Sequence, residues 1–237
     1  VYFNEGRLSR QAIMREIDGT LSRLGTDYLD LYIIHRFDYD TPIEETMEAL
    51  HDLVKAGKVR ALGASAMYGY QFYNMQLAAR DNGWTPFSAM ENHYNLLYRE
   101  DERELLPICK QMKVSLMPYS PLAAGHLARP QWKSESLRGT TDRVAMGKYD
   151  KTEAEDMQIV KRVAELAEKY NCKMSQIAIA WQWAKGILSP IIGATKTQYL
   201  DDSAGAFDIK LTAEDLAYLE EPYVPHEIVG AIDKNPA

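Results

Sequence analysis

The stretch LDLYIIHRFD, from Leu29 to Asp38, decides the fold of this chain. It begins as an almost continuous apolar run of β-branched and aromatic residues and then breaks into His35, Arg36, Phe37 and Asp38. A short apolar run bounded in this way is typical of a buried parallel strand. Parallel strands arranged as a barrel carry their chemistry at the carboxyl ends, so His35 is the first candidate site residue.

Strand-like and helix-like segments alternate along the rest of the chain with a step of roughly 25 to 30 residues, which is typical of βαβ units around a parallel sheet. Strands are predicted over 29–35, 59–65, 87–92, 114–119 and 190–193. Helices are predicted over 9–24, 43–56, 71–82, 104–112, 153–169, 175–185, 199–207 and 212–219. The pattern shows no linker, so we expect one α/β domain over residues 1–237.

Local signals mark the ends of several helices. Thr41-Pro42-Ile43-Glu44 has the form of a capping box with proline at the first helical position, and Thr212 with Asp215 has a similar form. Between Leu122 and Asp150 the alternation lapses into an irregular stretch. An irregular stretch of this length in a compact domain is usually functional, often a lid.

Composition excludes several classes of function. The 237 residues carry a net charge of −7, so the basic surface that nucleic acid or an acidic membrane requires is not expected. No apolar run approaches the roughly 20 residues that span a bilayer. The two cysteines, Cys109 and Cys172, have no metal-binding spacing, and no metal site is expected. Without a secretory signal, the cytoplasm is the expected location.

The predicted strand ends carry residues that suit a polar planar ligand joined to a phosphate. Ser65 and Glu91 can hydrogen-bond an amide, and Tyr119 offers a flat face for stacking. The turn from Gly193 to Lys196 precedes a predicted helix, and backbone amides at a helix start attract anions.

Five motifs in order, LYIIHRFD, LGAS, ENHYNLL, PYSPLAAGHL and IIGATK, resemble the aldo/keto reductases over essentially the whole chain, closest to the bacterial branch related to potassium-channel beta subunits. The resemblance implies a (β/α)8 TIM barrel that binds NADPH, or alternatively NADH, across the carboxyl ends of its strands. It also implies reduction of a small carbonyl substrate, an aldehyde or ketone, to an alcohol by hydride transfer without metal. It implies no oligomeric state.

The resemblance also implies roles for individual residues. His35 matches the tetrad histidine that orients the carbonyl, and Tyr119 matches the aromatic residue beneath nicotinamide. The other expected contacts of the cofactor are the carboxamide partners Ser65 and Glu91, the pyrophosphate loop residues Ser120, Leu122 and Gly125, and the adenosine-end residues Gly193, Lys196, Asp202 and Ser203.

Three positions depart from the family pattern. Ala66 stands where the family has an amide-binding Asn, and Glu91 stands where it has Gln, so donor capacity toward the carboxamide is lost. Tyr199 occupies a position that is often Arg in NADPH-preferring members, so preference for NADPH is expected to depend mainly on Lys196.

The other tetrad residues of the family, Asp, Tyr and Lys, have no match, and no Asp-Thr-Ala-x-x-Tyr-Gly-like motif occurs. Val1-Tyr2-Phe3 resembles the residues directly after the tetrad lysine. We therefore expect an N-terminally truncated barrel that lacks roughly its first three strands and is inactive alone.

Two other interpretations remain. A non-catalytic barrel that binds cofactor or a partner would also lack tetrad residues. An unrelated barrel aldolase or isomerase would need a Schiff-base lysine or a carboxylate at a strand end, and Lys196 is predicted in a turn rather than a strand.

Overall fold

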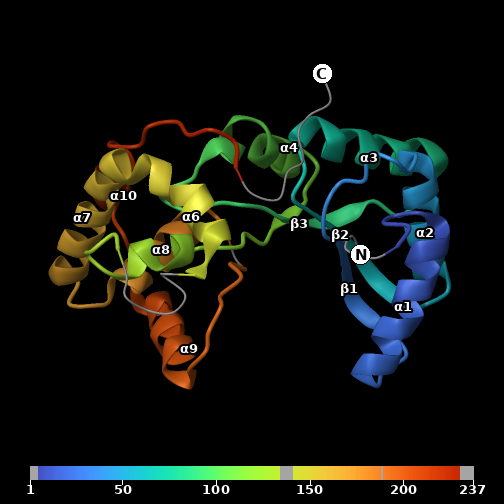
Figure 1. Ribbon diagram of the computed structural model, residues 1–237, viewed down its shortest axis with the longest axis horizontal. Helices are drawn as coiled ribbons and strands as arrows, with labels where there is room; N and C mark the ends of the chain where they lie inside the picture. The colour runs from blue at the N-terminus through green and yellow to red at the C-terminus, as the bar shows by residue number, and fades with distance from the viewer. Residues whose placement is uncertain (1–4, 134–140, 188, 230–237) are drawn as a thin grey trace. The chain divides into compact units, whose positions relative to one another are not determined.

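The computed structural model describes residues 5–133, 141–187 and 189–229. These residues form two compact units. The first comprises the described residues through Glu91 together with Arg103–Ser115, and the second comprises Asn92–Glu102 and the described residues from Leu116 onward. Figure 1 shows the helices and strands of both units.

The first unit is built on parallel strands (Figure 1). Its strands are β1 (Leu29–Ile34), β2 (Val59–Ser65) and β3 (Phe87–Glu91), and the sheet order is β1-β2-β3-β4, with β4 being Ser115–Leu116. β1 pairs with β2 and β2 with β3, both in parallel. Helices α1 (Arg10–Leu24), α2 (Ile43–Lys55), α3 (Gly69–Asn82) and α4 (Leu105–Gln111) alternate with these strands along the chain. The predicted alternation of strand and helix is therefore confirmed in this unit.

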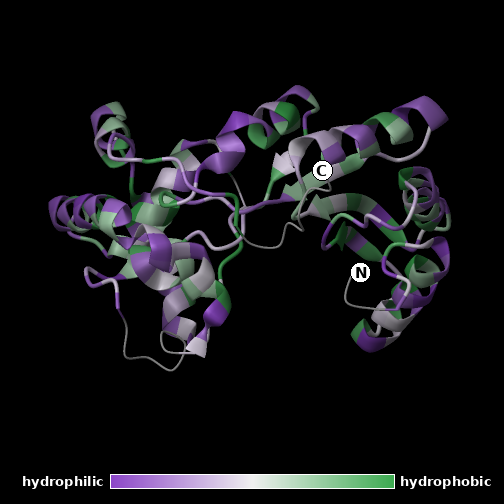
Figure 2. Ribbon diagram, turned by 45° about the horizontal axis from the view of Figure 1, so that its top comes forward, coloured by the Kyte–Doolittle hydropathy of each residue, from purple (hydrophilic) through white to green (hydrophobic). Residues whose placement is uncertain are grey.

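Amphipathic patterning explains why these helices pack as they do. In α1, Ile13, Ile17 and Leu21 recur at helical spacing and are buried, whereas the intervening residues are polar. The helices accordingly carry hydrophobic and hydrophilic bands (Figure 2). Ser9 caps α1 by accepting a hydrogen bond from the Ala12 amide.

The predicted capping box before α2 is wrong. Pro42 is the N-cap and makes no side-chain capping bond. The Thr41 hydroxyl instead donates a hydrogen bond of 2.7 Å to the carboxylate of the buried residue Asp38. This carboxylate also accepts hydrogen bonds from the backbone amides of Leu8 and Asp40. Asp38 therefore competes successfully for the hydroxyl that the sequence pattern assigns to the helix start.

The second unit is mainly helical. Its elements are η1 (Glu100–Arg103, of which the last residue belongs to the first unit), η2 (Ala123–Ala128), α6 (Arg143–Tyr149), η3 (Asp150–Thr152), α7 (Glu153–Lys169), α8 (Met174–Ala184), α9 (Thr197–Ala204), η4 (Gly205–Asp208) and α10 (Ala213–Glu220). Helix α8 forms its core, because the side chains from Ile177 through Gln182 are all buried. It packs against α7, α9, η2 and η4.

Two predicted strands are shorter than expected. The segment 114–119 has strand β4 only at Ser115–Leu116, followed by an isolated bridge at Tyr119, which pairs with His93 and Ile191. Ile191 is in turn the only bridge residue of the predicted strand 190–193 among the described residues. The apolar runs are correctly placed, but their backbones do not make extended ladders.

The expected irregular stretch from Leu122 to Asp150 contains two short helical pieces, η2 and α6. Residues 134–140 of that stretch, and Val1-Tyr2-Phe3, lie outside the described residues. The prediction of a single barrel over residues 1–237, short of roughly three strands, stays a prediction.

Candidate functional site

Three predicted site residues share one edge of the sheet in the first unit. β1, β2 and β3 run parallel, and their pairing places Ile34 opposite Ala64 and Ser65 opposite Glu91. His35 directly follows β1, while Ser65 and Glu91 are the last residues of β2 and β3. The structure therefore brings His35, Ser65 and Glu91 to the carboxyl edge, where parallel α/β sheets hold their ligands.

The contacts within this edge are specific. Ser65 is buried, and its hydroxyl donates to the main-chain carbonyl of Glu91 at 2.9 Å. Ala66 has a φ of 45°, in the left-handed region that non-glycine residues seldom adopt, and its amide donates to the same carbonyl at 3.4 Å. The chain therefore turns sharply at the end of β2, at the position where the family pattern has Asn.

Burial changes the charge state of this edge. Burial raises the pKa of the Glu91 carboxyl, because the charged form loses its hydration. Burial and the positive charge of Arg36 lower the pKa of His35, so the imidazole is held neutral at neutral pH. A neutral imidazole donates a hydrogen bond from its one N–H group. A carboxyl donates a hydrogen bond only when it is protonated, and a raised pKa favours that form.

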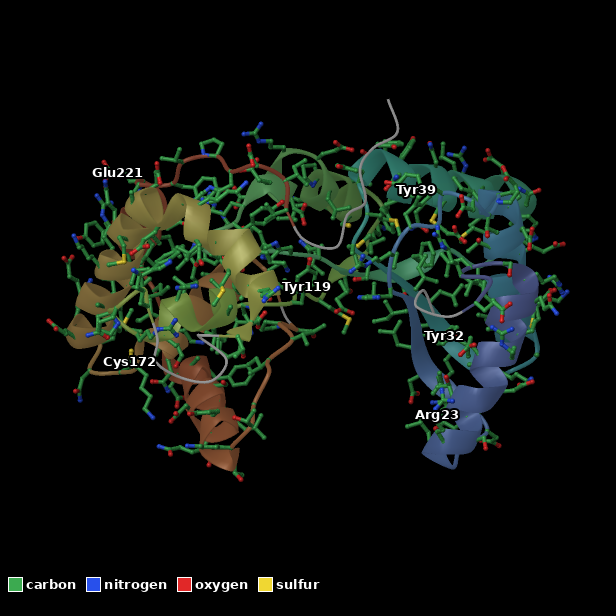
Figure 3. All side chains as sticks on the ribbon, in the orientation of Figure 1. Arg23, Tyr32, Tyr39, Tyr119, Cys172 and Glu221 are labelled. Atoms are coloured by element: carbon green, nitrogen blue, oxygen red, sulfur yellow. The ribbon has the colours of Figure 1, made fainter. Side chains whose placement is uncertain are left out.

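The second unit holds Tyr119, which is labelled in Figure 3, and the predicted residues of the loop that follows it. The Tyr119 amide donates to the carbonyl of Asn92 at 2.9 Å, and the ring of Tyr119 lies parallel to that of His93. The ammonium of Lys148, on α6, lies 4.6 Å from the centroid of the Tyr119 ring. Tyr119 is thus held at a strand-like position with its ring in a defined plane.

The loop from Ser120 to Gly125 has an unusual backbone. Positive φ angles occur at Ser120 (56°), Ala123 (47°), Ala124 (55°) and Gly125 (99°). Strained positions of this kind persist only when the surroundings hold them, and they cluster at ligand-binding sites. Left-handed residues also turn successive amides toward one side, an arrangement that suits phosphate oxygens. Ser120, Leu122 and Gly125 therefore lie in a segment whose backbone fits the predicted role.

The residues predicted for the adenosine end lie around the start of α9. Lys196 is the N-cap of that helix, and a side chain added at Gly193 would meet no atom within 4 Å. Asp202 pairs with Lys173 at 2.5 Å, and the Ser203 hydroxyl donates to the carbonyl of Tyr199 at 2.7 Å. Lys196 and Gly193 are accessible to a ligand, whereas Asp202 and Ser203 already have partners inside the protein.

The sequence does not predict a buried polar group beside Tyr119, although it places His93 close to the site. His93 and Asn95 lie two and four residues beyond the end of β3, and both are buried. His93 Nε2 lies 2.8 Å from the hydroxyl of Tyr149. The same hydroxyl accepts a hydrogen bond from the side-chain nitrogen Nδ2 of Asn95 at 3.1 Å. The position of His93 two residues beyond a strand end was a usable signal, but nothing in the sequence pairs it with Tyr149, 56 residues away.

Two histidine side chains outside the strand ends are also largely buried. His226 has only 4% of its side chain exposed and lies 3.0 Å from Asp156. His126 is buried against Trp132, with ring centroids 4.0 Å apart. Among the residues that the structure describes, no group of three His, Cys, Asp or Glu side chains is arranged to hold a metal ion. No helix in the same described part is both long and apolar enough to cross a membrane.

Comparison with known proteins decides the family. A model of the aldo/keto reductase family matches residues 1–223. The chain belongs to the aldo/keto reductase family. A solved thermostable aldo-keto reductase, in complex with the inhibitor epalrestat, superimposes with a TM-score of 0.73 at 27% identity, covering 91% of this chain and 67% of that one. The family assignment and the α/β fold class with a parallel sheet are thereby confirmed.

Several curated relatives of this aldo/keto reductase come from fungi. It is 46% identical over 230 residues to an aldo-keto reductase of Fusarium vanettenii, covering 97% of this chain and 62% of the relative. It is 44% identical over 228 residues to versiconal hemiacetal acetate reductase of Aspergillus parasiticus, covering 96% and 66%. It is also 44% identical over 230 residues to a putative aryl-alcohol dehydrogenase of Schizosaccharomyces pombe, covering 97% and 64%.

These relatives refine the resemblance. The sequence motifs suggest the bacterial branch related to channel beta subunits, whereas the relatives described here are fungal. This aldo/keto reductase chain spans between 62% and 66% of the length of these three relatives.

Proposed function

We propose that this aldo/keto reductase chain binds NADPH, with NADH as the alternative, for the reduction of a small aldehyde or ketone. The observation that carries the proposal is the arrangement at the sheet edge, where His35 follows β1 while Ser65 and Glu91 end β2 and β3. Family membership supports it, because aldo/keto reductases use nicotinamide cofactors in general.

Each unit offers groups that suit a part of a dinucleotide. In the first unit, Ser65 and Glu91 offer groups for the carboxamide, and in the second unit, Tyr119 offers a flat ring at a strand-like position. In the second unit, the left-handed residues Ser120, Ala123, Ala124 and Gly125 give the loop a backbone that suits the pyrophosphate. Lys196, at the start of α9, suits the phosphate that distinguishes NADPH from NADH.

When bound, the reduced nicotinamide supplies the hydride that goes to the carbonyl carbon, and the carbonyl oxygen takes a proton to complete the alcohol. His35, held neutral by burial and by Arg36, donates a hydrogen bond to the carbonyl oxygen and so orients and polarises it. The family's proton-donating tyrosine has no match among these 237 residues, so we infer turnover only for a protein that supplies one.

Fluorescence titration of the chain with NADPH and with NADH tests cofactor binding. We expect saturable NADPH binding, and we expect Lys196→Met to weaken NADPH roughly tenfold while NADH changes little, because a charged hydrogen bond to the extra phosphate is lost. Lys161→Met, an exposed lysine on α7, is the matched control and should leave both affinities unchanged.

The same protein is then assayed with an aromatic aldehyde, 4-nitrobenzaldehyde, a choice that follows the name of the aryl-alcohol dehydrogenase relative. If the chain binds neither NADPH nor NADH, the proposal is refuted. Tight binding without any reduction is expected of this chain, because the family's proton-donating tyrosine has no match in it, and reduction by this chain would contradict that inference. We also propose a cytoplasmic location, which cell fractionation tests.

A further inference from the structure

The ring of Tyr119 belongs to a stack that the proposed function does not use. The imidazole of His93 is stacked on Tyr98, with centroids 4.1 Å apart and planes 14° apart. It is also stacked on Tyr119, with centroids 5.2 Å apart and planes 7° apart. His93 therefore links the ring expected beneath nicotinamide to a ring buried in the second unit.

Hydrogen bonds fix the protonation state of this imidazole. The Asn95 amide nitrogen can only donate, so the Tyr149 hydroxyl accepts from it and uses its own proton toward His93 Nε2. His93 is then neutral, with its proton on Nδ1. Burial, together with the positive charges of Lys148 and His226, lowers the pKa of His93 well below its ordinary value, in agreement with this assignment.

The side-chain amide of Asn95 also contacts the loop of left-handed residues that begins at Ser120. Asn95 Nδ2 also donates to the carbonyl of Ser120 at 2.9 Å, and Ser120 is the first left-handed residue of the loop. Asn95 is completely buried, so this bond lies away from solvent, where an unmade bond is costly. One connected group thus holds the plane of Tyr119 and the backbone of the residue that follows it.

We propose that His93, with Tyr149 and Asn95, is a positioning residue for nicotinamide: it sets the plane and offset of the Tyr119 ring on which nicotinamide stacks. The inference rests on the proposed function and deepens it. His93 acts through Tyr119 and takes no part in proton transfer, because its Nε2 accepts from Tyr149 and the residue is buried.

Two ligands separate a positioning role from a general loss of structure. NADPH carries nicotinamide, whereas 2′-phospho-ADP-ribose has the same adenosine and phosphate groups without it. We expect His93→Leu to raise the dissociation constant of NADPH about fivefold, the order expected for a lost aromatic stack, and to leave that of 2′-phospho-ADP-ribose within about twofold.

Tyr149→Phe is the second variant, because it keeps the ring and removes only the hydrogen bond to His93. We expect a weaker loss in the same direction, about twofold to threefold for NADPH alone. His51→Leu is the matched control: His51 hydrogen-bonds Thr85 within the first unit, so its loss should affect both ligands equally or neither. Thermal unfolding of each variant shows whether it is folded, and Tyr149→Phe carries the test if His93→Leu is not.

The outcomes are distinct. Equal weakening of both ligands, or no weakening of either, in folded variants overturns the positioning role and leaves the proposed function intact. Failure of the unsubstituted chain to bind NADPH overturns both.

Discussion

Glu91 is the single residue at which this chain departs most informatively from its family pattern. A glutamine there would both donate to and accept from the carboxamide, whereas an ionised carboxylate only accepts. The structure offsets part of that loss, since burial raises the pKa of Glu91 and favours the protonated form that can donate. Nicotinamide binding should then depend on pH through this one group.

We therefore predict that NADPH binds more weakly as the pH rises through the raised pKa of Glu91. Glu91→Gln should abolish that dependence and tighten binding roughly threefold to tenfold at pH 8, the effect of one added hydrogen bond. The variant should also raise the unfolding free energy at neutral pH, because a carboxyl with a raised folded pKa loses stability as the pH increases.

A series of fluorescence titrations from pH 4.5, the ordinary pKa of the group, up to pH 8 measures this effect, and Glu104→Gln provides the control at the start of α4. A pH dependence that survives in Glu91→Gln would assign it to another group. The sequence placed Glu91 near the end of a strand predicted over 87–92, and β3 ends at Glu91 itself. The protonation state of this carboxyl depends on burial that only packing produces.

At the scale of single helices, local sequence predicts one helix start correctly and another wrongly. Thr212 and Asp215 form the predicted capping box of α10, with reciprocal bonds of 3.1 Å and 3.0 Å between side chains and amides. Thr41 has the same pattern but donates to Asp38 instead. A capping pattern therefore predicts a cap only where no buried acceptor competes for the hydroxyl.

We predict that Thr212→Ala lowers the unfolding free energy by about 1 kcal/mol, the usual cost of losing an N-cap. Thr197→Ala should cost clearly less, because Thr197 begins α9 without capping it and the N-cap there is Lys196. Urea denaturation of the two variants measures both values. Equal effects would show that the cap of α10 contributes nothing measurable.

At the scale of the whole chain, the second unit is tied together by its last described segment, residues 222–229. The Tyr223 hydroxyl and the His226 amide both donate to Glu100, more than 120 positions earlier, and the Arg99 amide donates to Tyr223. His226 Nε2 lies 3.0 Å and 3.1 Å from the two oxygens of Asp156. Both side chains of this pair are almost fully buried.

This pair predicts a stability that depends on pH. Burial alone lowers the pKa of His226, but the hydrogen bond and charge of Asp156, with further attraction from Glu100, raise it overall. Its contribution is therefore complete below pH 6.5, the ordinary value, and is lost as the pH rises through the folded pKa. Asp156→Asn should cost roughly 3 kcal/mol at pH 6, as expected for breaking a buried pair, and clearly less at pH 9.

Melting temperatures from pH 6 to pH 9 measure the effect. The control is Glu227→Gln, whose partner Lys151 lies 3.8 Å away with both side chains exposed, so its substitution should change little. A cost of Asp156→Asn that is the same at both pH values would contradict the assigned charge of His226.

Periodicity and local composition determined the strands β1, β2 and β3, most helices, and the strand-end residues His35, Ser65 and Glu91, because apolar spacing reflects which face each element buries. Tertiary structure alone decided the rest. The group of His93, Asn95 and Tyr149, the pair of His226 with Asp156, and the acceptor of Thr41 all join residues distant in sequence or compete with a local pattern. Burial then sets whether those groups are charged, since desolvation depends on the whole surrounding fold.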